Sequence, residues 1–261
     1  MKIANPLYDH AFKYMMSNDR IARKVLSTIL DEEVVELDLM QQEVLVENKI
    51  RLFTLYRLDF KATVVQADGT RRKILIELQK SKLPTNVLRF RNYLSHAYRE
   101  NGYRRKKRSE SAAVVTANDE LAVAESEALP IVAIYILGYN LADIPVMAAR
   151  VDNQVVDAST NEVLDLESNF IDLLTHRCYV LQVRRLPKKR RTRIEQFMTL
   201  FNQAWISEED YILDLDIDEI PEEFRDVARY LRRPLQDEDI RMRLEAEEEF
   251  EDTRIKSQTS A

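Results

Sequence analysis

The chain has 261 residues, of which 39 are basic and 45 acidic, so its formal net charge is −6 at pH 7. The apolar fraction of 45% is ordinary for a globular protein, and the length suits one large domain or a domain with an appendage. The single cysteine, Cys178, excludes an intramolecular disulfide and fits a cytoplasmic protein. Only three glycines are present, which excludes a glycine-rich dinucleotide loop and a P-loop, so we expect no nucleotide cofactor.

The sequence also argues against a membrane association. Its longest apolar run, residues 131–137, is too short to span a bilayer. The first thirteen residues include the acid Asp9 and have no apolar core, so they do not have the pattern of a signal peptide.

The N-terminal part predicts two helices and an edge strand. Asn5 and Pro6 are typical of a helix N-cap and of the first helical position. A second helix is expected to begin at Ser17 or Asn18, because apolar residues then recur at helical spacing. Residues 33–47 alternate between apolar and polar types, which favours an edge strand or an irregular segment.

Residues 55–80 predict a β-hairpin with two acids facing each other. A loop of residues 67–69, with Gly69 in the left-handed region, is a common three-residue connection. The resulting register makes every pair on one face apolar: Leu58 with Leu78, Phe60 with Ile76, and Ala62 with Ile74. On the other face it sets Asp59 opposite Glu77, with Gln79 one step further along. A two-residue loop would slip the register by one residue and mix the two faces.

Carboxylates at Asp59 and Glu77 would repel each other, so the sheet needs a compensating cation or a raised pKa. Mg²⁺ takes one or two protein carboxylates and keeps its other positions for water and phosphate. A metal site is therefore one interpretation of this face. The alternative is an exposed sheet face on which Arg57, Lys61 and Lys73 neutralise the two acids.

Beyond the hairpin, the pattern predicts one helix and three strands. The helix begins at Pro84 and ends near Asn101. Residues 129–139 form an apolar run rich in β-branched types, which indicates a buried central strand. Shorter strands are expected at residues 146–156 and 180–186.

The chain is expected to have two parts. The first is an α/β domain over residues 1–186, in which the weakly hydrophobic segment 104–128 is an insertion or loop. The second is a helical, charged C-terminal extension over residues 187–261 that ends in a disordered tail.

Basic residues gather in two zones of this acidic chain, at 89–108 and at 184–193. The first zone contains Arg89 and the run Arg104, Arg105, Lys106, Lys107 and Arg108. Such blocks suggest a local face that binds a polyanion. The alternative, equally supported, is that they are solvated helix ends paired with the acidic segments 206–223 and 245–252.

Several short motifs follow one another within residues 5–185. In chain order they are D-x-x-F-K at 9–13, an aspartate at 59, I-E-x-Q at 76–79, R-x-x-x-Y-L-S-x-x-Y at 89–98, a Gly-Tyr pair at 102–103 and the apolar strand from 129. Each motif is weak alone. As a series they resemble the PD-(D/E)XK nuclease family transposases, a family also called recombination-promoting nuclease or transposase-like proteins.

The resemblance implies a restriction-endonuclease-like α/β core, with a mixed central sheet flanked by helices and the active site on the central hairpin. It implies a DNA endonuclease that depends on Mg²⁺ or Mn²⁺ and acts in recombination or mobile-element biology. Asp59 and Glu77 would hold the metal, Gln79 would stand at the position of the motif lysine, and Asp9 would add an acid beside the metal. By resemblance, Arg89 would contact the phosphate, supported by Tyr93, and Lys13 is a further candidate for DNA binding. The 104–128 segment departs from the family pattern: its basic residues Arg104, Arg105, Lys106, Lys107 and Arg108 suggest a loop that contacts DNA, and the alternative is a neutral insertion.

Gln79 is the main departure from the superfamily pattern. A glutamine cannot take a proton, although its amide can hold a water by hydrogen bonds. Lys61 and Lys73 lie on the carboxylate face and are candidate substitutes, whereas Lys80 should point to the opposite face. An alternative is a catalytically impaired nuclease-fold module that binds nucleic acid or a protein partner. A homodimer is left open, since cutting both strands of a duplex often takes two active sites.

Overall fold

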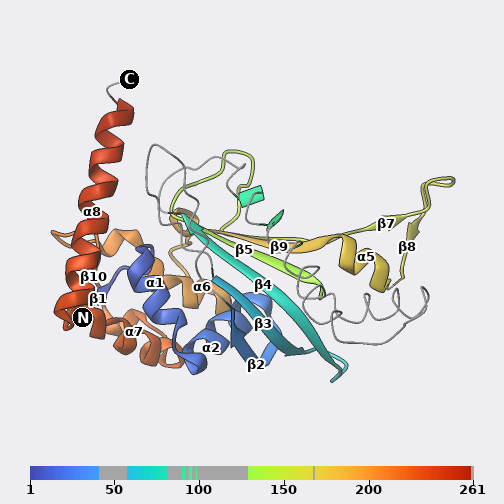
Figure 1. Cartoon of the computed structure of the whole chain (residues 1–261), viewed down its shortest axis with the longest axis horizontal. Coiled ribbons are helices and arrows are strands. Elements are labelled where there is room, and N and C mark those ends of the chain that lie inside the picture. Colours follow the sequence, from blue (N-terminus) through green and yellow to red (C-terminus); the bar gives the residue numbers. More distant parts are fainter. Residues whose placement is uncertain are drawn as a thin grey trace, which may run out of the picture.

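The computed structural model describes residues 1–40, 58–81, 90–91, 94–95, 98, 129–166 and 168–259. Expectations for Arg57, Arg89 and the segment 104–128, with its basic run, lie outside the described residues. The described chain is a mixed α/β protein in which helices flank a central mixed sheet (Figure 1). The helices of this part of the chain are too short or too polar to span a bilayer.

The central sheet has six strands in the order β2-β3-β4-β5-β9-β6. Their bounds are β2 (Glu33–Leu39), β3 (Leu58–Val65), β4 (Arg71–Ser81), β5 (Ile131–Leu137), β9 (His176–Gln182) and β6 (Ala148–Val151). Strands β4, β5 and β9 are parallel neighbours, and the other pairs are antiparallel. The strand expected at 129–139 is confirmed as β5, which is buried in the middle of the sheet.

The predicted hairpin register is confirmed. Leu58 pairs with Leu78, Phe60 with Ile76, Ala62 with Ile74, and Asp59 with Glu77. The loop closes with a hydrogen bond from the Gln66 amide to the Thr70 carbonyl oxygen at 2.9 Å. Gly69 has a φ of +83°, the left-handed conformation that this loop requires.

The remaining elements of the described chain are helices, 3-10 turns and two small sheets. The helices are α1 (Asp9–Met16), α2 (Asp19–Leu30), α5 (Asn169–Leu174), α6 (Arg193–Met198), α7 (Arg225–Leu231) and α8 (Glu238–Thr259). The 3-10 turns are η2 (Val183–Arg185), η3 (Thr199–Phe201), η4 (Gln203–Trp205), η5 (Ile217–Glu219), η6 (Glu222–Phe224) and η7 (Arg233–Leu235). Two small antiparallel sheets join β1 (Lys2–Ala4) to β10 (Ile212–Asp214) and β7 (Val155–Val156) to β8 (Val163–Leu164).

The first helix begins later than the sequence indicated. Asn18 caps α2 as predicted, accepting a hydrogen bond from the Ile21 amide at 3.1 Å. Asn5, in contrast, is fully buried ahead of α1, which starts at Asp9. Its side-chain oxygen accepts from the Leu7 amide at 3.1 Å, and its nitrogen donates to the Asp210 carbonyl oxygen at 2.8 Å. Asn5 therefore joins the N-terminal turn to a distant segment instead of capping a helix.

The main hydrophobic core lies where α1 and α2 cover one face of the sheet. Its buried members include Met15 on α1, Leu26 on α2, and Phe60 and Ile76 on the hairpin. The same cluster contains Phe197, Phe201, Phe224 and Leu231. Packing is therefore continuous across residue 186, where two parts were expected. These four apolar residues of the C-terminal segment pack on α1 and α2 and do not form a separate core.

The C-terminal segment begins with a shorter helix than expected and ends with the helix that was expected. Helix α6 has a capping box formed by Thr192 and Glu195, but it ends at Met198 and continues as 3-10 turns. The charged helix expected at the end of the chain is confirmed as α8 over residues 238–259, which leads away from the sheet (Figure 1).

Candidate active site

Glu77 and Gln79 lie on the face of the sheet that α1 and α2 do not cover. Strand residues alternate between faces, and the intervening Ile76 and Leu78 belong to the core beneath α1 and α2. Leu75, on the same face as Glu77, belongs instead to a separate cluster with Ile131 and Leu129. The hairpin therefore presents its polar residues to a second, smaller apolar layer.

Both side chains are buried and hydrogen-bonded to each other. Glu77 is 0% exposed and Gln79 is 3% exposed. Gln79 Nε2 donates to Glu77 Oε1 at 2.9 Å. In this contact the amide nitrogen is the donor and the Glu77 oxygen the acceptor. The other amide atom, Gln79 Oε1, is buried without a hydrogen-bond partner in the described part of the chain.

An acceptor without a partner is the most informative feature of this site. Leaving a buried polar atom unsatisfied costs about 1–3 kcal/mol. The atom is an amide oxygen beside a carboxylate, and both are hard oxygen ligands of the kind that Mg²⁺ and Mn²⁺ prefer. A bound cation or a water held by it would satisfy Gln79 Oε1, so these residues fit the expected metal.

The sheet register supplies the neighbours of this pair. Asp59 is directly opposite Glu77 on β3. On the parallel side, Ala133 stands beside Glu77, and Cys178 stands beside Ala133. Tyr135 stands beside Gln79. Glu77 thus has Asp59 as its neighbour on β3, and the less polar residues Ala133 and Cys178 follow it across β5 and β9.

Burial governs the electrostatics around the pair. It raises the pKa of Tyr135 to about 12, and the nearby Cys178 and Glu77 add to this shift. Burial also raises the pKa of the Cys178 thiol and lowers that of His176, which lies 3.2 Å from the Tyr98 hydroxyl through its Nδ1. Burial therefore favours the neutral forms of Tyr135, Cys178 and His176, because a low-dielectric environment disfavours charge. A cation placed here would interact strongly with the carboxylates because little water screens them.

Sequence reasoning did not identify Tyr135, which stands beside Gln79, or its electrostatic neighbours Tyr98 and Cys178. The one available signal was Tyr135, a hydroxyl-bearing residue inside an apolar strand. The helix expected after Pro84 supplies the cover: the described residues 90–91, 94–95 and 98 are helical. Phe90 contacts Tyr135 with ring centroids 5.0 Å apart.

Asp9 forms its closest described contact on the other face of the sheet. Lys80 is 6% exposed, and its Nζ lies 2.6 Å from Asp9 Oδ1 and donates to the Leu7 carbonyl oxygen. This confirms that Lys80 points away from the face of Gln79. Asp9 therefore forms an ion pair with Lys80 on this face, and its role as an acid beside the metal stays a prediction. Strand alternation accounts for the position of Lys80, because it sends residues 79 and 80 to opposite faces.

Other basic candidates are placed only in part. Lys61 stands opposite Leu75 and Lys73 opposite Thr63, so both lie on the carboxylate face as predicted. Lys13 is half-buried on α1. The implied DNA contacts Arg89 and 104–108 lie outside the described residues.

No cluster of three or more His, Cys, Asp and Glu residues suited to a metal occurs among the described residues. The side chain of Asp59 lies outside the part of the structure to which this statement applies. Neither a family model, a curated protein nor a solved structure matches this chain.

Proposed function

We propose that this protein is a metal-dependent DNA endonuclease of the transposase-like PD-(D/E)XK type, with a restriction-endonuclease-like core. The observation that carries the proposal is the hairpin register. It sets Asp59 opposite Glu77, and the buried Gln79 Oε1 near Glu77 has no hydrogen-bond partner in the part of the chain that the structure describes. The mixed sheet flanked by helices is consistent with this assignment.

Asp59 and Glu77 would hold Mg²⁺ or Mn²⁺, with Gln79 Oε1 as a further oxygen ligand or as the acceptor for a bound water. When bound, such a metal supplies a Lewis acid for the scissile phosphate and a water that deprotonates near neutral pH. Gln79 orients the attacking water through its amide oxygen while its nitrogen stays fixed on Glu77. Lys13, Arg89 and the run 104–108 would contact the DNA backbone.

A second candidate is a catalytically impaired module on the same fold that binds nucleic acid or a protein partner. The complete burial of Glu77 and its hydrogen bond to Gln79 favour it. A buried carboxylate is tolerated when it is hydrogen-bonded, so the pair can serve structure alone. In that case the acids would matter for stability and not for cleavage.

The test is divalent-dependent nicking of a supercoiled plasmid by the wild type, Asp59→Asn and Glu77→Gln. The matched control is Asp38→Asn, an exposed acid on the neighbouring strand β2. We expect each site variant to lose at least about 100-fold in rate, since even outer partners of metal ligands cost 10–100-fold when replaced. The control should cleave at the wild-type rate, and EDTA should abolish cleavage.

Titration of Mn²⁺ by calorimetry separates the two candidates. Wild-type protein that neither nicks DNA nor binds Mn²⁺ would refute the endonuclease. Salt-sensitive DNA binding that is unchanged in Glu77→Gln would then support the binding module. A third outcome is wild-type protein that binds Mn²⁺ but does not nick DNA. If Gln79→Lys then gains nicking activity, the glutamine is the reason that the wild type is inactive.

A further inference from the structure

A pocket of about 290 Å³ lies where the start of α2 meets α7 and η7. Its lining includes Arg20, Arg229 and Arg233, with Tyr230 and Asp226. We call this the basic pocket. It lies on the side of the molecule formed by α2 and the C-terminal helices, away from the Glu77 face of the sheet, and the proposed endonuclease chemistry does not use it.

Two lining residues of the basic pocket, Tyr230 and Arg233, belong to a group of stacked side chains. The rings of Tyr14 and Tyr230 stack with centroids 4.7 Å apart and an interplanar angle of 24°. The Arg233 guanidinium lies 5.1 Å from the centroid of Tyr230. A stacked guanidinium loses little further freedom when it binds a ligand, so Arg233 is held ready to donate hydrogen bonds.

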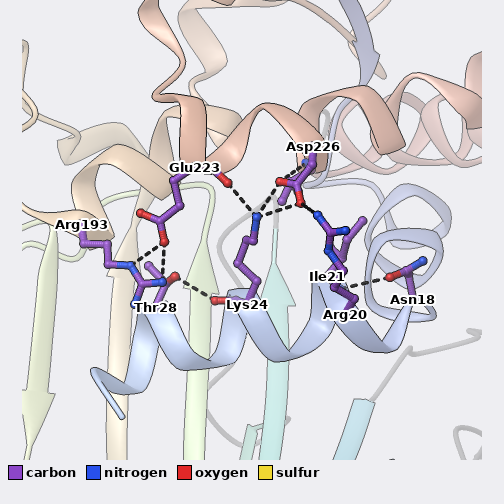
Figure 2. Close-up of polar contacts among 9 residues, drawn as sticks. Asn18, Arg20, Ile21, Lys24, Thr28, Arg193, Glu223 and Asp226 are labelled. Atoms are coloured by element: carbon purple, nitrogen blue, oxygen red, sulfur yellow. Dashed lines mark hydrogen bonds and ion pairs between the residues drawn. The ribbon is translucent and has the colours of Figure 1, made fainter. Parts of the chain in front are cut away.

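The single carboxylate in the lining does not neutralise the basic pocket. Asp226 accepts from Arg20 Nη2 at 2.6 Å, and both its oxygens lie 2.8 Å from Lys24 Nζ (Figure 2). Burial alone would raise the pKa of Asp226, yet its hydrogen bonds to Lys24 and Arg20 lower it. The lining thus contains three arginines and one carboxylate, an excess of two positive charges, and Lys24 adds a further cation beside Asp226.

Nearby acids are engaged elsewhere. Glu223 accepts from Arg193 Nε at 2.8 Å (Figure 2), and Asp19 pairs with Arg23 at 2.6 Å. The positive excess at the basic pocket is therefore not cancelled by these neighbours. This is notable in a chain whose net charge is −6.

A second pocket provides an internal comparison. It has about 340 Å³ and lies at the end of the sheet where β5 and β9 begin. Its arginines are each matched by an acid within 3.4 Å: Arg72 with Asp172, Arg150 with Asp152, and Arg177 with Glu32. Balanced pairs of this kind leave no charge for a ligand, so of these two pockets in the described part of the chain it is the basic pocket that suits an anion.

We infer that the basic pocket binds a phosphate group. Guanidinium groups present forked donors that match phosphate oxygens, and several of them converging on one cavity favour a doubly charged anion over chloride. A volume of about 290 Å³ admits a phosphate with part of its ester and excludes a duplex. The phosphate comes either from a DNA backbone lying across the opening or from a free phosphate compound.

The test measures binding in EDTA, so that its outcome does not depend on metal or on cleavage. Arg229→Gln/Arg233→Gln removes two exposed charges of the basic pocket, and Arg232→Gln is the matched control because it is exposed on the same segment outside the lining. Pyrophosphate and a duplex without terminal phosphates are titrated into each protein. Circular dichroism confirms that the variants are folded.

We expect wild type and Arg232→Gln to bind pyrophosphate alike, and the double variant to bind it at least about 10-fold more weakly. If the double variant also binds the duplex more weakly, with a salt slope lower by about 2, the phosphate belongs to DNA. If its duplex affinity is unchanged, the ligand is a free phosphate compound. Wild type that binds neither ligand, or a loss equal in Arg232→Gln, would overturn the inference.

Discussion

Helix α8 is held on α1 by Glu247, and replacing this residue should weaken that attachment measurably. The Glu247 carboxylate accepts from the Asp9 amide at 2.6 Å and from the His10 amide at 3.3 Å. It also lies 3.1 Å from His10 Nδ1 and 3.9 Å from Lys80 Nζ. With 13% of its side chain exposed, Glu247 acts as a buried N-terminal cap supplied by a distant helix.

The expected cost follows from these contacts. Loss of a helix cap costs up to about 2 kcal/mol, and partly buried hydrogen bonds to a charged group raise the total. We therefore expect Glu247→Ala to lower the free energy of unfolding by about 2–3 kcal/mol. Glu247→Gln keeps one acceptor oxygen but no charge, so its cost should be about 1 kcal/mol.

Urea unfolding followed by circular dichroism provides the measurement. Glu249→Ala is the control, because Glu249 is an exposed acid on the same helix and should change stability by less than about 0.5 kcal/mol. A second readout is hydrogen exchange at the amides of Asp9 and His10, which should quicken in Glu247→Ala alone. Equal stability of the Glu247→Ala and Glu249→Ala variants, with no faster exchange, would refute the reasoning.

The contribution of Glu247 should also depend on pH. Burial alone would raise its pKa, but the hydrogen bond with His10, the charge of Lys80 and the backbone amides lower it below the ordinary 4.5. A lowered folded pKa means that the stabilisation is complete above the unfolded value and is lost as pH falls through the folded one. The gap between wild type and Glu247→Gln should therefore narrow below about pH 4.5.

Two smaller effects can be measured by the same unfolding assay. Gly69→Ala should cost about 1–2 kcal/mol from the backbone alone, because φ is +83° and an added Cβ meets nothing within 4 Å, whereas Gly69→Asn should cost less. Equal costs for the two substitutions would contradict a backbone origin. Asp226→Asn should cost about 1 kcal/mol, since its pairs with Lys24 and Arg20 are partly exposed. Because the pKa of Asp226 is lowered, this difference should disappear in acid, and a difference unchanged down to pH 2 would contradict it.

The hairpin was predictable because all its determinants are local. The apolar pairs fix one face, and Gly69 fixes the loop length, so the two kinds of evidence agree on one register. That register also placed Glu77 and Gln79 on one face, where the structure joins them by a hydrogen bond. Here local sequence was enough to assemble part of the candidate site.

The rest of the site depends on partners that the local pattern does not contain. Tyr135 stands beside Gln79, and Cys178 stands two strands from Glu77, only because β4, β5 and β9 are parallel neighbours, an order that no short motif encodes. The same holds for the Asp9–Lys80 ion pair. Asn5 shows the limit most clearly. Its residue type suits a cap, yet burial against the segment around Asp210 outweighs that preference.

The pairing of β1 with β10 has a consequence for how the chain folds during synthesis. The two strands are separated by roughly 210 residues, and α7 packs on α1 and β1 from a similar distance. At ribosomal rates of about 5–20 residues per second, α1 and α2 wait about 10–40 seconds for the segments that cover them. During that interval their apolar sides are open to chaperones or to other nascent chains. Production at lower temperature or with added chaperone capacity should therefore raise the yield of native protein more than changes to its surface charge.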